Sequence, residues 1–169
     1  IYLDKNLSAR EKLRVLKYYE YFWSPSCMAI KKNDFLPFLT KFENIQLAPG
    51  IFISTILATI NKAIFLDKEK LTFYRIHPST SNPPLSKNDF FNNRQVFYKT
   101  SLESLEKITH YVTYNNDALD FANIFLLLTR LNYYIFSDNS NLSRKDLIKY
   151  FISFNKSKDF LRISEIIYF

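Results

Sequence analysis

The 169-residue chain contains a single glycine, Gly50, where average usage of about 7% would supply roughly a dozen. Turns must therefore be built from Asn, Asp, Ser and Pro. A glycine-rich phosphate-binding loop is also excluded, because neither G-x-G-x-x-G nor a P-loop can be written with one glycine.

Cysteine and long apolar runs are just as scarce. Cys27 is the one cysteine, so the chain can form no internal disulfide and has no Cys/His set for a structural zinc site.

No run of eighteen apolar residues exists, so no segment is expected to span a membrane. Charged residues between Asp4 and Lys12 interrupt the N-terminus, so no signal peptide is expected either. We therefore expect a cytoplasmic chain, with membrane association left open.

Aromatic and basic residues are abundant instead. The chain has 17 Phe and 12 Tyr with 47% hydrophobic residues, which predicts a folded chain of one domain with a sizeable core. The net charge is +7, which favours nucleotides, nucleic acids or an anionic membrane surface as partners. The basic residues are scattered, however, and no block exceeds Lys31-Lys32, which disfavours nucleic acid.

The first half of the chain mixes helical and strand patterns. Ser8 and Glu11 have the spacing of a capping box, which predicts a helix over residues 9–21. A short buried strand is expected at 27–30, a helical turn at 33–38, a helix at 51–61, and strands at 63–66 and 71–77.

The second half, after Pro83-Pro84, has a helical pattern throughout. Helices are expected at 87–108, from Asn115 or Asn116 to Phe136, after Ser143, and at 158–167, with residues 124–128 as a buried centre. The helix after Ser143 is basic and amphipathic, and we favour packing on the core over a bilayer contact. The predicted fold is α+β and mostly helical: a partial sheet in residues 1–84 and a helical tail in 85–169 packed on it.

Special chemistry is densest in the stretch LTFYRIHPSTSN, residues 71–82. On an extended strand, Arg75 and His77 point to one face. Pro78 then stops the strand, and the Ser, Thr and Asn residues up to Asn82 supply short polar groups suited to a turn. This pattern is typical of an anion site, and also of a solvated strand end whose His is satisfied by hydrogen bonds. From these residues alone, both interpretations stay open.

Three pieces of the chain together resemble the C-terminal half of the catalytic domain of family-2, GT-A-type glycosyltransferases. The first is S-C-M-A-I-K-K from Ser26, which is similar to the family's strand before the acceptor-side helix. The second is A-P-G-I-F from Ala48, leading into a helix. The third is L-T-F-Y-R-I-H from Leu71, which is similar to the family's L-x-x-Y-R-x-H motif. The pieces occur in the family's order and cover about a third of the chain.

The resemblance implies a role in transferring a sugar from a nucleotide-sugar donor to an acceptor. Arg75, His77 and Ser81 are the implied diphosphate-binding residues, and His77 is also the implied ligand of a divalent metal, Mn or Mg. Trp23, Ser26 and Pro49 are implied on the acceptor side. For Trp23, a place in the hydrophobic core is the favoured alternative.

Two departures from the family pattern stand out. No two Asp residues lie two positions apart, so the family's metal-binding Asp-x-Asp is missing. Gly50 stands where the resemblance implies a carboxylate general base, so no catalytic residue is assigned. The chain also begins with Ile1 rather than Met.

We therefore expect a glycosyltransferase-like C-terminal portion that is inactive alone. It would belong to a longer enzyme or be a non-catalytic remnant, and the metal would bind only in the complete enzyme. The alternative is a non-enzymatic, basic helical module that binds a partner protein or nucleic acid. Nothing in the sequence indicates the oligomeric state.

Overall fold

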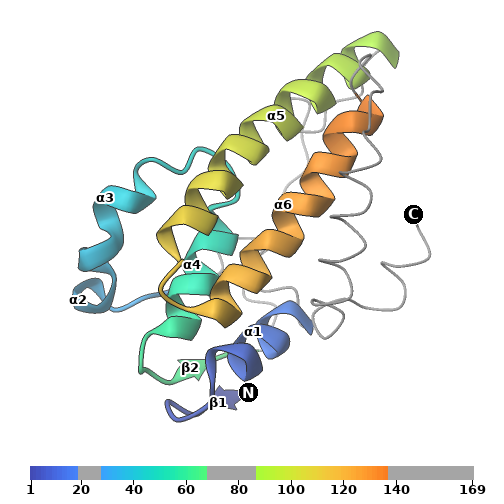
Figure 1. Ribbon diagram of the computed structural model, residues 1–169. Coiled ribbons are helices and arrows are strands. Elements are labelled where there is room, and N and C mark those ends of the chain that lie inside the picture. The colour runs from blue at the N-terminus through green and yellow to red at the C-terminus, as the bar shows by residue number, and fades with distance from the viewer. Residues whose placement is uncertain (19–27, 68–86, 137–169) are drawn as a thin grey trace.

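The computed structural model describes residues 1–18, 28–67 and 87–136, and over these the fold is α+β and mostly helical, as predicted. Figure 1 shows α5 and α6 as a long antiparallel pair, with α4 beside them and α1 and a small sheet at one end. The elements are β1 (Tyr2–Leu3), α1 (Ala9–Tyr18), α2 (Lys32–Phe35), the 3-10 turn η2 (Leu36–Phe38), α3 (Leu39–Phe42), α4 (Pro49–Thr59), β2 (Ile64–Phe65), α5 (Lys87–Tyr111) and α6 (Asn116–Phe136).

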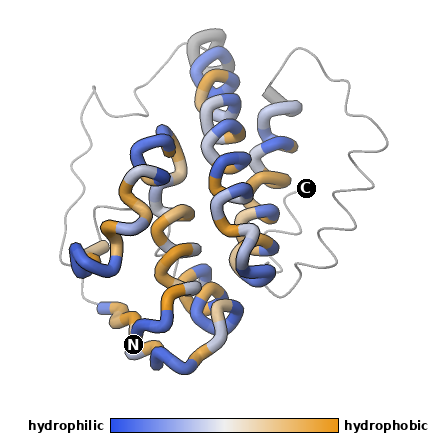
Figure 2. The backbone as a smooth tube through the Cα atoms, turned by 60° about the vertical axis from the view of Figure 1, so that its left-hand side comes forward, coloured by the Kyte–Doolittle hydropathy of each residue, from blue (hydrophilic) through white to orange (hydrophobic). Residues whose placement is uncertain are grey.

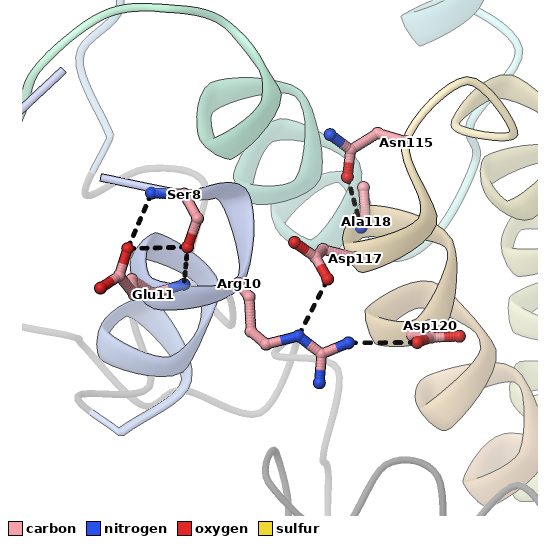
Figure 3. Close-up of polar contacts among 7 residues, drawn as sticks. All are labelled: Ser8, Arg10, Glu11, Asn115, Asp117, Ala118 and Asp120. Carbon is pink, nitrogen blue, oxygen red and sulfur yellow. Dashed lines mark hydrogen bonds and ion pairs between the residues drawn. The ribbon is translucent and has the colours of Figure 1, made fainter. Parts of the chain in front are cut away.

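The start of α1 is the predicted capping box. The Ser8 hydroxyl oxygen accepts a hydrogen bond from the Glu11 amide at 3.2 Å, and the Glu11 carboxylate accepts one from the Ser8 amide at 2.8 Å (Figure 3). The Ser8 hydroxyl also donates to the same carboxylate at 2.7 Å. These hydrogen bonds stabilise the charged carboxylate and lower the pKa of Glu11. The sequence therefore located this helix start correctly.

The segment between α1 and α4 differs from the prediction. A buried strand was expected at residues 27–30, but Met28, Ala29 and Ile30 have no regular secondary structure and none of them is buried. That prediction is wrong for these three residues, because a short apolar run does not by itself identify a strand. The helical turn predicted at 33–38 is present as α2 and η2 and continues through α3.

The core is centred on α4, which begins at Pro49, close to the predicted start at residue 51. Proline is tolerated there because the first amides of a helix have no partner inside the helix. Every residue from Gly50 to Ile56 is buried, and Phe52 is fully so. A helix that is apolar all round is expected to be enclosed by its neighbours. The helix packs against both α1 and α6, and Figure 2 colours most of its residues as hydrophobic.

The sheet consists of β1 and β2, which are antiparallel and pair Tyr2 with Phe65 and Leu3 with Ile64. The inner face packs on α1 and forms a small second cluster of Leu3, Leu16, Ile64 and Leu66. The strand β2 lies within the predicted range 63–66, whereas β1 was not predicted, because two residues carry no alternating pattern.

The antiparallel pair α5 and α6 matches its predicted ranges closely. Asn115 is the cap of α6, since its side-chain oxygen accepts a hydrogen bond from the Ala118 amide at 3.0 Å (Figure 3). Buried side chains of the pair join those of α1 and α4 in the main core, including Leu13, Ile51, Phe52, Ile56, Leu105, Ile108, Ala118, Phe121, Ala122, Ile124 and Phe125.

The predicted buried centre at 124–128 is correct only in part. Ile124 and Phe125 are buried, but the next three leucines are only half-buried. Five consecutive residues cover the whole circumference of a helix, so they cannot all face one core. The best-buried positions lie one to two turns earlier, at Ala118, Phe121 and Ala122.

Several predicted elements lie outside the described residues. These are the strand at 71–77, the boundary at Pro83-Pro84 and the helices after residue 136. The division of the chain at residue 84 therefore stays a prediction. Within the described parts, no helix is both long enough and apolar enough to cross a membrane.

Candidate functional site

The predicted site residues divide into two groups. Trp23, Ser26, Arg75, His77 and Ser81 lie outside the described residues, so their contacts stay a prediction. The remaining two positions, Pro49 and Gly50, lie at the start of α4, and the structure describes their surroundings in detail.

The backbone makes an unusual turn into α4. Ala48 has φ 62° and ψ 34°, the left-handed conformation, and it is the only non-glycine residue with positive φ among those described. A Cβ in this conformation costs about 1–2 kcal/mol. The turn lets the Ala48 carbonyl accept from the amides of Ile51 at 3.1 Å and Phe52 at 3.3 Å. Ala48 therefore fixes the direction in which α4 starts.

Gly50 is the second residue of α4 and is buried. The position where the resemblance implies a general base therefore lies in the interior of the described structure. A carboxylate placed there would lose its hydration and would need a paired partner. Sequence and burial agree that residue 50 supplies no proton acceptor in this chain.

Two side chains of α5 hold the connector before α4. The hydroxyl oxygen of Ser104, which is 2% exposed, accepts a hydrogen bond from the Leu47 amide at 3.0 Å. One turn further along, the Lys107 ammonium donates to the Asn44 carbonyl at 3.1 Å. Residues three apart lie on the same side of a helix, so one face of α5 fixes both ends of this connector.

A row of aromatic rings packs around the start of α4. The ring centroids are 5.3 Å apart for Phe35 and Phe42, 6.0 Å for Phe42 and Phe52, and 6.3 Å for Phe52 and Tyr111. The Lys41 ammonium lies 5.5 Å from the centroid of the Tyr111 ring, within the range of a cation–π contact. These contacts join α2, α3, α4 and α5 around the start of α4.

The opposite end of α4 is held by a buried cation. Lys12 is 1% exposed, and its ammonium donates to the carbonyls of Lys5 at 3.2 Å, Ile60 at 3.4 Å and Lys62 at 3.1 Å. A cation is favourable there because the C-terminal end of a helix carries a partial negative charge. Burial lowers the pKa of Lys12, and the nearby charge of Asp4 opposes that shift. Since an ammonium has three donors and three carbonyls accept them, Lys12 has a structural role.

The sequence contains a signal for the burial of Lys12. Lys12 and Leu16 are four residues apart, so they share a face of the predicted helix. A lysine on an apolar face indicates a buried cation that needs acceptors.

An ion-pair group joins α1 to α6. Arg10 contacts the carboxylate of Asp117 at 2.9 Å and that of Asp120 at 3.3 Å (Figure 3). The three side chains are 30–37% exposed, so solvent screens the pairs and each contributes little energy. Their role is to orient the N-terminus of α6 against α1.

The implied metal site cannot be built from the described residues. Residues 1–18, 28–67 and 87–136 contain no group of three or more His, Cys, Asp or Glu side chains able to hold a metal ion. His77 is not among these residues, so its metal-binding role stays a prediction.

No protein-family profile, curated protein or solved structure matches this chain. The likeness to family-2 glycosyltransferases therefore depends on the three sequence pieces alone.

Proposed function

We propose that this chain is the acceptor-side, C-terminal portion of a nucleotide-sugar-dependent glycosyltransferase of the GT-A type. The chain is inactive alone and contributes to sugar transfer as part of a longer protein, or it is a remnant that has lost catalysis. The remnant would keep the fold and lack turnover in any context.

One observation supports the proposal most: α4 begins at Pro49, within the second of the three resembling pieces. The resemblance implies a helix starting at this position. The strand β2 at Ile64–Phe65 lies between the second and third pieces in the sequence. The first piece adds less support, because Met28, Ala29 and Ile30 do not form the implied strand.

In this proposal Arg75 and His77 bind the donor diphosphate, with Ser81 as a hydrogen-bond donor. A guanidinium can pair with two phosphate oxygens at once, and a neutral imidazole can ligate Mn²⁺ or Mg²⁺. The metal, when bound, supplies positive charge that stabilises the leaving diphosphate.

The acceptor would approach from the side of Trp23, Ser26 and Pro49. The proposal assigns the protein to the cytoplasm and leaves contact with a membrane surface open. The connector held by Ser104 and Lys107 would keep the start of α4 in a fixed position.

The proposal predicts that the chain alone transfers no sugar, because it lacks both Asp-x-Asp and a base at residue 50. The measurement is release of nucleoside diphosphate from a panel of nucleotide-sugars with Mn²⁺ or Mg²⁺. We expect no release above that of a heat-treated sample. Turnover that survives repurification and disappears in His77→Ala would contradict this prediction.

A second measurement separates the enzyme from the remnant. If the gene encodes about 100 further residues before Ile1, with alternating strands and helices and an Asp-x-Asp, the longer protein should release nucleoside diphosphate when an acceptor is present. A start codon directly before Ile1 would contradict the hypothesis of a longer enzyme and would favour the remnant or the helical binding module.

A further inference from the structure

We draw no further inference here: the strongest candidate, the exposed aromatic pair Tyr2 and Phe65 on the outer face of the β1–β2 sheet, carries nothing because nothing in the structure shows what covers it.

Discussion

At the scale of single residues, Lys12 is a described position where one buried polar group links three segments of the fold. Its ammonium joins the loop after β1 to the end of α4 and to the residues leading into β2. Removing the amine takes this donor from the part-buried carbonyls of Lys5 and Lys62, whereas the Ile60 carbonyl still accepts from the Lys62 amide at 2.8 Å. A polar group left unsatisfied in a buried place costs about 1–3 kcal/mol. The apolar stem of the side chain also packs within the protein, so its length matters as well.

Lys12→Met should therefore lower the free energy of unfolding by about 2–4 kcal/mol, since methionine keeps most of the stem and removes the donors. Denaturant unfolding followed by circular dichroism measures this difference. Arg14→Met is the matched control, because Arg14 is an exposed cation on the same helix, and it should change the stability by less than about 0.5 kcal/mol. Equal, small effects of the two substitutions would show that the Lys12 ammonium does not stabilise the fold.

The lowered pKa of Lys12 also predicts a pH dependence. Its ordinary value is 10.5, and burial lowers the pKa in the folded state. Between the folded and unfolded values the unfolded chain binds more protons, so this group makes stability rise with pH. The destabilisation that comes from burying the charged amine is fully present below the pKa of the folded state and is lost above the pKa of the unfolded state.

Unfolding curves measured at increasing alkaline pH test this sign. The stability of the parent should rise relative to Lys12→Met as the pH approaches 10.5. A constant difference between the two proteins over that range would mean that Lys12 has the same pKa folded and unfolded.

At the scale of elements, the sequence was most informative where a helix carries both a cap and a long apolar pattern. Ser8 and Asn115 mark the starts of α1 and α6 as expected, and both side chains make their capping hydrogen bonds. The short elements were less predictable. A two-residue strand such as β1 exists because β2 pairs with it, and that pairing depends on residues more than sixty positions apart.

Burial along α6 gives a test at this scale. Phe121 is fully buried in the main core, whereas Leu127 is half-buried. Phe121→Ala should lower the free energy of unfolding by about 3–5 kcal/mol, because it removes a buried ring and leaves a cavity. Leu127→Ala should cost less, about 1–2 kcal/mol.

Lys99→Ala serves as the control for these two substitutions, since Lys99 is exposed on α5, and it should stay near zero. Thermal or denaturant unfolding of the four proteins measures the order. A larger loss of stability for Leu127→Ala than for Phe121→Ala would contradict this order and would favour residues 124–128 as the buried centre of α6.

At the scale of the whole molecule, one main core unites α1, α4, α5 and α6, so residues from both halves of the sequence stabilise each other. The sequence predicted the fold class correctly, because composition and helical periodicity are properties of long segments. It did not predict that α4 would be central, since that depends on which helices enclose it. For the candidate site, the absence of a base at Gly50 was visible in the sequence, and its burial needed the fold.

The proposed donor site would be formed by Arg75 and His77, which have no acidic neighbour in sequence closer than Glu69. If they bind a diphosphate, their contributions should differ in kind. The imidazole would act through the metal, whereas the guanidinium would contact phosphate oxygens directly. A hydrogen bond to a charged group is worth about 1.5–3 kcal/mol, which corresponds to roughly a 10- to 100-fold change in affinity.

The most direct test is the affinity of the longer protein for nucleoside diphosphate, measured by calorimetry with and without Mn²⁺ for the parent, His77→Ala and Arg75→Ala. We expect His77→Ala to weaken binding by roughly 10-fold or more only when the metal is present, and Arg75→Ala to weaken it in both conditions. Ser79→Ala, in the same stretch, is the control and should bind as the parent does. If all three variants fold and bind diphosphate like the parent, Arg75 and His77 do not bind the donor diphosphate, and this result would contradict the proposed function.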